Sequence, residues 1–401
     1  MNDSKTAMVE ITDELREWIR ENVREISDEE VIKYLDTKIQ EHISFAALSA
    51  REKIRLCDTI FYRTRKELNV LQQAADDPDV SEIMVNGKDD IFVERGGRLE
   101  KTDIHFESTE ELEEVIRRIA AKIHREINEL SPILDARLED GSRVNAVYRN
   151  IALNGPILTI RRFPASRITM KELLSFGTLT EEAADFLRKL VEAAYNIFIS
   201  GGTSSGKTTF LNALSNYIPK EERIITIEDS AELQIREIEN IVRLECRNSN
   251  VQGKGEVSMR QLIRASLRMR PNRIIVGEVR GEEVLDMIQA MNTGHDGSLS
   301  TGHGNSIRGM LFRLEAMFLQ AADFPIDAIR RQISEGIDIM VHLGRLPDKR
   351  RVVLEISEIA GMSGGEILLN PLFEFQPGTG LKRTTHKLID CTKLEVKGIS
   401  I

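Results

Sequence analysis

Cysteine is scarce in this sequence of 401 residues, and the three cysteines stand far apart, at Cys57, Cys246 and Cys391. Because no two of them have a paired spacing, the sequence indicates neither a disulfide framework nor a zinc site, which favours a reducing compartment. Long apolar runs are also missing, since the stretch Ile197 to Ile199 is far shorter than the roughly 18 residues that a membrane span needs. The first residues lack the basic-then-apolar order of a signal peptide. These absences predict a soluble protein of the cytoplasm.

An excess of positive charge is absent as well. The chain carries 55 Lys and Arg against 65 Asp and Glu, which gives a formal net charge of -10 and argues against a general affinity for nucleic acids. The composition is 41% hydrophobic and 30% charged, as expected for a globular protein. A chain of this length has room for two or three domains, each with its own core.

The first 165 residues combine helical and strand patterns. Residues 1–75 show helical spacing of apolar residues and a capping-box pair, Ser27 and Glu30, so they are expected to form a helical leader. Residues 76–165 show short strands separated by glycine turns and one helix that starts at Ser108, which predicts an α+β domain. Residues 164–167 are interpreted as a linker.

Helices and short apolar strands alternate from residue 166 onward. A helix is expected at 181–194, a strand at 196–200, a helix after Lys207 and strands at 223–227 and 273–276. Such alternation is typical of a mainly parallel sheet covered by helices, so the fold class is α/β. This domain is expected to span residues 166–345, and residues 346–401 are expected to form a C-terminal extension with short strands.

A phosphate-binding loop is the most specific motif of the sequence. It fits the pattern G-x-x-x-x-G-K-[ST] and lies between a predicted strand and a predicted helix, as the chemistry requires. In such a loop the backbone N–H groups and the helix N-terminus face the phosphates, while the lysine reaches the β- and γ-phosphates and the Thr208 hydroxyl ligates Mg²⁺. The nucleotide-binding residues expected here are Gly201, Gly202, Thr203, Ser204, Ser205, Gly206, Lys207, Thr208 and Thr209.

Acidic residues close two of the predicted strands. Gly277 and Glu278 follow a strand of β-branched residues, at the sheet edge where α/β proteins bind ligands, and a carboxylate there can hold Mg²⁺ waters or polarise the attacking water. Gly277 occupies the place where most proteins with this loop carry an aspartate, so another carboxylate has to share the task. Glu228 and Asp229, which end the strand before, are the candidates, although they also fit ordinary surface acids.

A stretch rich in glycine and histidine follows at residues 293–304 and contains His295 and His303. Its glycines permit close backbone approach, so a loop or short strand beside another element is expected there. No cysteine and no evident third ligand lie nearby, which argues against zinc. A role in sensing nucleotide or in coupling subunits fits better.

Taken in order, four segments of the chain resemble the motor motifs of the type II/type IV secretion ATPases: GGTSSGKTT, IEDSAEL, IIVGEVRG and TGHDGSLSTGH. They correspond to the motifs called Walker A, Asp box, Walker B with a glycine before the glutamate, and His box. Upstream, SEIMVNG, IFVERGGRLE, LDARLEDGSRVNAV and LTIRRF look like the branch called CpaF or TadA, which drives tight-adherence (Flp) pili. The resemblance runs from about residue 80 to about residue 343.

The resemblance implies roles for individual residues of a RecA-like motor domain. ATP and Mg²⁺ are the implied cofactors, with Thr208, Glu278 and Glu228 around the metal, in part through water. Glu278 and Glu228 would activate water, and His295 and His303 would couple the nucleotide to movement. Family members form hexameric rings in which arginines of the N-terminal domain reach the γ-phosphate, and Arg137, Arg143 and Arg161 match those positions.

The function that the resemblance implies is an ATP-hydrolysing hexameric motor for assembly of a tight-adherence pilus, with retraction left open. It would work in the cytoplasm, peripheral at the inner membrane, bound to platform proteins of the pilus or of a related secretion system, with no nucleic acid expected as partner. The alternative from another class is a DNA-translocating or conjugation-type secretion ATPase. A small-molecule kinase or a GTPase is less favoured, because the chain is long for a kinase and lacks the guanine-reading N-K-x-D motif.

Two further patterns are interpreted without assigning them chemistry. Arg260, Arg264 and Arg268 fall on one helix face, which by itself resembles a nucleic-acid stripe, but the negative net charge and the lack of interleaved aromatics favour a subunit interface or a solvated face. Residues 362–366 echo a transporter signature, but they lie after Glu278, where that signature precedes it, and are expected to form a hairpin turn.

Overall fold

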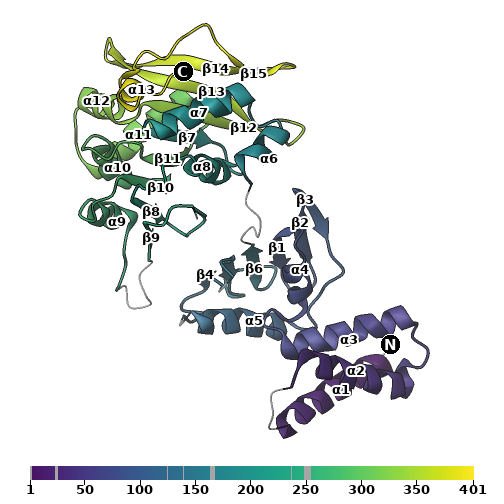
Figure 1. Ribbon diagram of the computed structural model, residues 1–401. Coiled ribbons are helices and arrows are strands. Elements are labelled where there is room, and N and C mark those ends of the chain that lie inside the picture. Colours follow the sequence, from purple (N-terminus) through teal and green to yellow (C-terminus); the bar gives the residue numbers. More distant parts are fainter. Residues whose placement is uncertain are drawn as a thin grey trace. The chain divides into compact units, whose positions relative to one another are not determined.

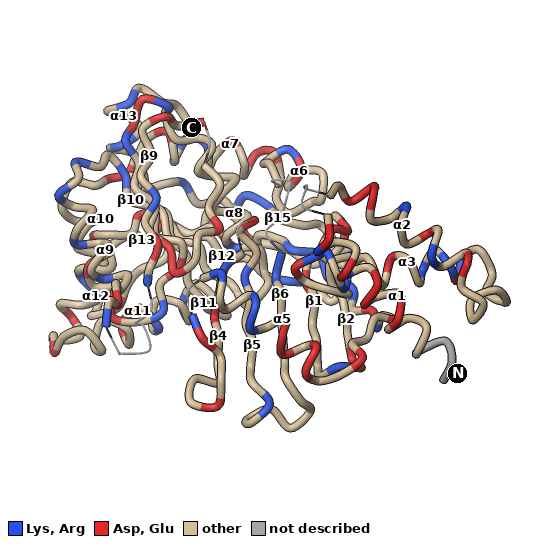
Figure 2. The backbone as a smooth tube through the Cα atoms, turned by 90° about the horizontal axis from the view of Figure 1, so that it is seen from below, with Lys and Arg blue, Asp and Glu red and all other residues tan. Residues whose placement is uncertain are grey.

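The computed structural model of the chain describes residues 2–22, 26–123, 125–138, 140–162, 168–235, 237–247 and 254–401, so the linker expected at 164–167 lies outside the described residues. The chain folds into two compact units, Met1–Ala165 and Ser166–Ile401 (Figure 1). In both units Lys and Arg are interspersed with Asp and Glu (Figure 2). The negative net charge is therefore not concentrated in one segment.

The first unit begins with a helical subdomain, as predicted for the leader. Its core is built from apolar side chains at helical spacing, with Leu15, Leu35 and Ile60 fully buried. The capping box of Ser27 and Glu30 is present at the start of α2. The helices are α1 (Asn2–Glu21), α2 (Asp28–Glu41) and α3 (Ala50–Arg65), with the short η1 (Ile43–Phe45) between α2 and α3. The short η2 (Asn69–Leu71) and α4 (Gln72–Asp76) follow α3.

The rest of the first unit is the predicted α+β subdomain. A six-stranded sheet has the order β3-β2-β1-β6-β5-β4, and its neighbouring strands are antiparallel. Helix α5 (Thr109–Lys122) starts after Ser108, whose side chain accepts from the N–H of Glu111, and it buries an apolar stripe of Leu112, Val115, Ile116 and Ile119. The strands are β1 (Val80–Asn86), β2 (Ile91–Arg95), β3 (Arg98–Lys101), β4 (Ile133–Arg137), β5 (Arg143–Val147) and β6 (Ile157–Arg161).

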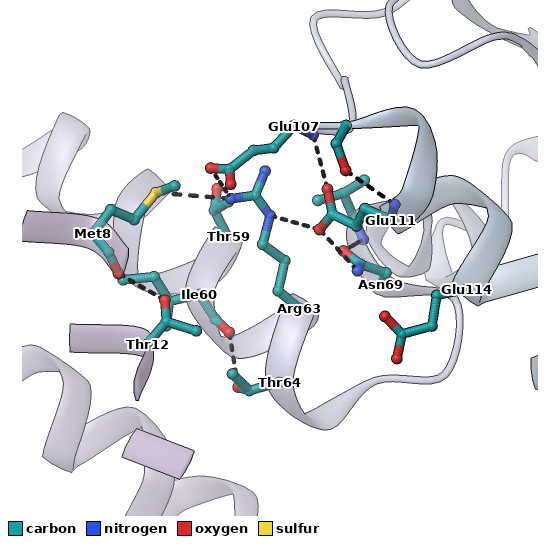
Figure 3. A network of polar contacts seen from close by, with 12 residues as sticks. Met8, Thr12, Thr59, Ile60, Arg63, Thr64, Asn69, Glu107, Glu111 and Glu114 are labelled. Atoms are coloured by element: carbon teal, nitrogen blue, oxygen red, sulfur yellow. Dashed lines mark hydrogen bonds and ion pairs between the residues drawn. The ribbon is translucent and has the colours of Figure 1, made fainter. Parts of the chain in front are cut away.

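Arg63 joins the helical subdomain to the start of α5 (Figure 3). From the last turn of α3, its Nη1 lies 2.6 Å from Oε1 of Glu107 and its Nε lies 3.3 Å from Oε1 of Glu111. The amide of Asn69 donates to the same oxygen of Glu111 at 3.0 Å. Only 10% of the Arg63 side chain is exposed, so these charged contacts are partly shielded from water.

The second unit is built on a nine-stranded sheet with the order β15-β14-β13-β12-β7-β11-β10-β8-β9. The strands from β12 to β9 in this order are parallel, which confirms the predicted parallel sheet. The parallel strands are β7 (Ile197–Gly201), β8 (Ile224–Glu228), β9 (Ile241–Glu245), β10 (Arg273–Val279), β11 (Leu299–His303) and β12 (Ile339–Arg345).

Residues after 345 continue this sheet instead of forming an extension of short strands. β13 (Arg351–Ser363) and β14 (Glu366–Gln376) are 13 and 11 residues long and pair antiparallel, with the short β15 (Gly380–Arg383) at the edge. These strands join the sheet because their apolar side chains are buried with it: Val353, Ile356 and Phe373 lie in the same core as residues of β7 and β12. The predicted hairpin turn is confirmed, since Ser363 pairs with Glu366 around two glycines with positive φ.

Helices cover both faces of the large sheet. On β7, Ile197 and Ile199 belong to one apolar cluster and Phe198 to another, because successive side chains of a strand point to opposite faces. The first cluster includes residues of α6 (Met170–Ser175), α7 (Glu181–Glu192), α8 (Lys207–Ser215) and α13 (Thr392–Lys397), and the second includes residues of α9 (Met259–Ser266), α10 (Glu283–Met291), α11 (Ile307–Ala321) and α12 (Ile326–Gly336).

Among all helices of the described residues, none is both long and apolar enough to span a membrane.

Candidate phosphate site

The predicted phosphate loop connects β7 to α8, as the motif requires. β7 lies inside the sheet, between β12 and β11, so the loop starts from a strand that is hydrogen-bonded on both sides. Two of its residues adopt left-handed backbone conformations, Ser204 with φ 58° and Gly206 with φ 92°. A Cβ atom at Gly201 would lie 2.5 Å from Oγ of Ser205, so the loop closes tightly on itself. A loop of this kind at a helix N-terminus fits an anionic phosphate.

Lys207 points back into this loop. Its Nζ donates to the carbonyl oxygens of Gly201 and Gly202 at 3.2 and 3.1 Å, and it lies 3.1 Å from Nδ1 of His303. Only 6% of the residue is exposed, and this burial lowers the pKa of Lys207, while the charge of Glu278 acts in the opposite direction. The ammonium group is therefore held inside the loop, where the sequence predicts it.

A chain of polar contacts continues from Lys207 across three strand ends. Nε2 of His303 lies 2.8 Å from Oε1 of Glu278, and Oε2 of Glu278 lies 3.3 Å from Nη2 of Arg280. Nη1 of Arg280 lies 3.3 Å from Oδ2 of Asp229. Because Lys207 can only donate, Nδ1 of His303 has to accept, and the proton of the neutral ring is then on Nε2, facing the carboxylate.

Strand order explains why these side chains meet. In the parallel sheet β7, β11, β10 and β8 are consecutive neighbours, and His303 is the register partner of Gly201. The carboxyl ends of all four strands therefore lie at one edge, as is usual for ligand sites of α/β proteins. Of the loop or short strand expected at residues 293–304, Leu299–His303 form strand β11.

The pKa of His303 is lowered from the ordinary histidine value, and burial is the largest cause. Positive charges on Lys207, Arg280 and Arg313 lower the pKa further, whereas Glu278 raises it. The net direction favours the neutral ring at pH 7. A neutral His303 is consistent with the acceptor role of Nδ1 toward Lys207.

Glu228 has a different environment from Glu278. It is 3% exposed, and its Oε2 accepts from the backbone N–H groups of Glu232 and Leu233 at 2.7 and 2.9 Å. A Cβ atom at Gly277 would lie 3.0 Å from Cγ of Glu228. The close approach of Glu228 is thus a steric reason for glycine at the place where most proteins with this loop carry an aspartate. The role of Glu228 in activating water stays a prediction.

The expected metal ligands fit Mg²⁺ better than a metal that needs a full set of protein ligands. Thr208 and Thr209 lie half-buried in the first turn of α8, and Glu278 is within the Lys207 contact chain. Within the described ranges, no group of three or more His, Cys, Asp or Glu side chains is placed to hold a metal. A hydroxyl and a carboxylate suit Mg²⁺, which keeps several waters and also binds substrate phosphates.

The two histidines of the glycine-rich stretch are not brought together. His295 precedes β11, and its Nδ1 lies 3.2 Å from the carbonyl oxygen of Ala290 in α10. His303 is the last residue of β11, so it lies at the other end of this strand from His295, at the edge of the sheet where the phosphate loop begins. The next residue after His295, Asp296, lies 2.8 Å from Nζ of Lys393 in α13. Within one chain, His303 alone of the two contacts the residues of the phosphate loop.

The three predicted arginines form a row in the first unit. Arg137 on β4 is the register partner of Arg143 on β5, and Arg143 is the partner of Arg161 on β6. The row continues to Glu82 on β1, opposite Arg161. Cross-strand partners project from the same face with Cβ atoms about 5 Å apart, and like charges placed so are destabilising. A row of guanidinium groups of this kind favours an anion as partner.

Arg280 is a residue of the contact chain that was not assigned to the site from the sequence, whereas Asp229 was a candidate acid beside Glu228. A signal for Arg280 was present, because it follows Glu278 by two positions at a strand end, and residues i and i+2 of a strand share one face. The contact between Asp229 and Arg280 had no such signal, since it depends on β8 and β10 being neighbours.

Residues 64–360 match the family described as Type II/IV secretion system protein. An uncharacterized protein of Methanocaldococcus jannaschii is 40% identical over 287 residues, which cover 69% of this chain and 39% of that protein. The chain thus spans well under half of this archaeal relative. A putative conjugal transfer protein of Mycobacterium tuberculosis is 33% identical over 291 residues, which cover 71% of this chain and 82% of the relative.

The fold is also found among solved structures. The crystal structure of the pilus retraction motor PilT with bound ADP aligns with a TM-score of 0.54 and 21% identity, covering 82% of this chain and 86% of that one. At this identity the likeness concerns the fold: an α/β domain with a mainly parallel sheet that follows an α+β domain. Motifs, fold and family match agree, and the chain belongs to the type II/IV secretion system protein family.

Proposed function

We propose that this chain binds Mg²⁺ and ATP at the phosphate loop, hydrolyses the ATP, and acts in a hexameric ring as the motor of a secretion or pilus apparatus. The observation that carries the proposal is the contact chain from Lys207 through His303 to Glu278. It connects the residue that binds phosphate with the carboxylate best placed to act on water. An ordinary glycine turn with a chance lysine would not have this connection.

Each residue of the contact chain has a task in this proposal. Lys207 offers positive charge to the β- and γ-phosphates, and the backbone N–H groups of the loop hold them in place. Glu278, oriented by Arg280, accepts the proton of the attacking water or orients that water. His303 stays neutral between Lys207 and Glu278, so its position responds to both. When bound, Mg²⁺ supplies positive charge that stabilises the negative charge on the phosphate oxygens.

The arginine row provides the remaining positive charge in the proposed reaction. At least one of Arg137, Arg143 and Arg161 would reach the γ-phosphate, from the same subunit or from a neighbour in the ring. The support is their cross-strand alignment, which gathers three positive groups on one sheet face. An arginine that stabilises the charge of phosphoryl transfer contributes roughly a thousand- to a hundred-thousandfold to the rate.

The cellular task proposed is assembly of a tight-adherence pilus, in the cytoplasm at the inner membrane and through contact with membrane-embedded platform proteins. Its support is the resemblance of the segments upstream of the motor motifs to the CpaF or TadA branch. A ring that closes its domain pairs in sequence can pass rotation to a platform protein in its centre.

A second candidate is a conjugation-type ATPase that acts on DNA. It is favoured by the Mycobacterium tuberculosis relative, which is described as a putative conjugal transfer protein. The predicted basic stripe does not add to it, and Arg268 lies beyond the end of α9 at Ser266, so the helix carries only two of the three arginines. Arg260 and Arg264 lie 2.7 and 2.6 Å from the buried carboxylate of Asp286, so their charges are compensated within the chain.

The test uses the full chain and its Lys207→Ala variant. We expect Mg²⁺-dependent ATP hydrolysis by the wild type, a loss of at least a hundredfold in the variant, and stimulation by cytoplasmic segments of the platform proteins. A strain with the variant should make pilin but display no pili. Stimulation by DNA and not by the platform segments would instead support the conjugation candidate. Absence of hydrolysis by the wild-type ring would contradict both.

A further inference from the structure

The start of β13 contacts the phosphate loop. Nε of Arg351 donates to the backbone carbonyl oxygen of Ser204 at 3.0 Å, across 147 positions of sequence. The aliphatic part of the same side chain passes close to the next glycine, since a Cβ atom at Gly206 would lie 3.4 Å from Cδ of Arg351. Arg351 was not among the residues expected in the site.

Sheet topology brings Arg351 to this place. β12 is the neighbour of β7, with Leu343 as the register partner of Gly201. The hairpin that follows returns the chain antiparallel, so Arg351 pairs with Arg345 at the edge where the phosphate loop begins. The contact therefore depends on residues after 345 continuing the sheet.

Ser204 is the point of the loop where an outside contact has most effect. Its φ of 58° is a left-handed conformation that residues other than glycine rarely adopt. A hydrogen bond to its carbonyl oxygen fixes the orientation of the following peptide unit, which lies directly before Ser205 and Gly206. Since the loop binds anions through its backbone N–H groups, that orientation decides how well the groups converge.

We propose that Arg351 is a positioning residue of the phosphate site, which holds the left-handed Ser204 and so preorganises the loop for the phosphates of a nucleotide. This inference rests on the proposed function and adds a part of the site that lies outside the loop, helix and strand-end motifs. Its prediction is a change in nucleotide affinity that depends on the conformational freedom of residue 204.

A matched control stands next to Arg351. The Arg350 side chain is also exposed and belongs to the same hairpin, but its Nε lies 2.7 Å from Oδ2 of Asp348. Among the described residues, no contact connects Arg350 with the phosphate loop. Arg350→Ala therefore removes the same charge from the same hairpin and leaves Ser204 untouched.

The experiment measures the dissociation constant of the β,γ-imido analogue of ATP, with Mg²⁺, for the full chain and its variants. We expect Arg351→Ala to weaken binding on the order of tenfold, as for loss of one charge-assisted hydrogen bond, and Arg350→Ala to stay within about twofold of the wild type. Arg351→Gln keeps an N–H donor for the carbonyl of Ser204 and should recover most of the affinity.

A double-mutant cycle with Ser204→Gly separates positioning from direct contact with the nucleotide. Glycine adopts positive φ without steric cost, so Arg351→Ala should lose most of its effect in the Ser204→Gly background. An equal loss in both backgrounds, or a loss in Arg351→Gln as large as in Arg351→Ala, would overturn the positioning role. So would wild-type affinity in a folded Arg351→Ala protein. If the wild type and Arg350→Ala both fail to bind, the proposed function fails first.

Discussion

Nζ of Lys207 lies 3.1 Å from Nδ1 of His303, although 96 positions of sequence separate the two residues. The contact joins the phosphate loop to the strand end of β11 and leads on to Glu278. A lysine that only donates and a histidine that accepts on one ring nitrogen define a single protonation pattern. The following predictions test that pattern and the residues around it.

His303 is expected to titrate below the ordinary histidine value, because its burial outweighs the charge of Glu278. In Glu278→Gln the pKa should fall further, and in Arg280→Gln it should rise. Since the folded-state pKa is lowered, the unfolded chain takes up this proton first, so His303 costs stability as the pH falls below about 6.5. NMR of labelled histidine Cε1, with His303→Gln to assign the signal, measures these shifts. A rise of the pKa in Glu278→Gln would contradict the arrangement.

Glu278→Gln should abolish turnover but preserve nucleotide binding. The change removes the carboxylate that is proposed to act on water, an expected loss of roughly a hundred- to ten-thousandfold, and leaves the loop and Lys207 in place. Lys207→Ala should lose both turnover and binding. Steady-state hydrolysis and equilibrium binding of ATP separate the two outcomes. Glu282→Gln, which changes an exposed acid paired with Arg260, serves as control and should keep wild-type turnover.

Replacing Arg137, Arg143 and Arg161 together by glutamine should lower the turnover by about a thousandfold. The melting temperature should change little, because relief of the repulsion among the three cations opposes the loss of partners such as the carbonyl of Gly141 and the carboxylate of Glu82 opposite Arg161. The matched control is Arg149→Gln, since Arg149 lies 3.1 Å from Glu113 within the same subdomain. Hydrolysis and thermal melting are measured on all variants. Full turnover of the triple variant would remove the row from the site.

Arg63→Ala should destabilise the attachment of the helical subdomain by about 1 to 3 kcal/mol, because it leaves Glu107 and Glu111 without their shared cation (Figure 3). Limited proteolysis around residues 66–72 should then become faster. Arg16→Ala breaks an exposed pair with Asp13 on α1 and is expected to be near neutral. Equal protease resistance of Arg63→Ala and the wild type would show that the contact is dispensable.

Local signals predicted much of the fold. Ser27 and Ser108 mark helix starts through their own caps, and the glycine pair of the β13–β14 hairpin marks a turn. Strand β11 was less evident, since it contains Ser300, Thr301 and Gly302 and yet is buried. The hydroxyl of Thr301 is satisfied by a neighbouring strand, since its Oγ1 donates to the carbonyl oxygen of Gly277. Such compensation depends on strand order and has no local pattern.

The candidate site was also predictable only in part. Lys207, Glu278 and His303 each belong to a recognisable motif, and the structure brings them into contact. Two contacts could not be found from motifs, that of Asp229 with Arg280 and that of Arg351 with Ser204, because they require β8 beside β10 and β13 beyond β12. The residues after 345 looked peripheral for the same reason.

The separation of the apolar clusters has a consequence for how the chain can be handled and how it could have arisen. Each of the four buried clusters takes its described members either from residues up to 165 or from residues after it. Either half thus carries the interior that it needs to fold as a separate polypeptide. Co-expression of two fragments cut near residue 165, or exchange of one half between relatives, should preserve both interiors, so recombination at this point is a route by which a protein of this family can acquire a new N-terminal half.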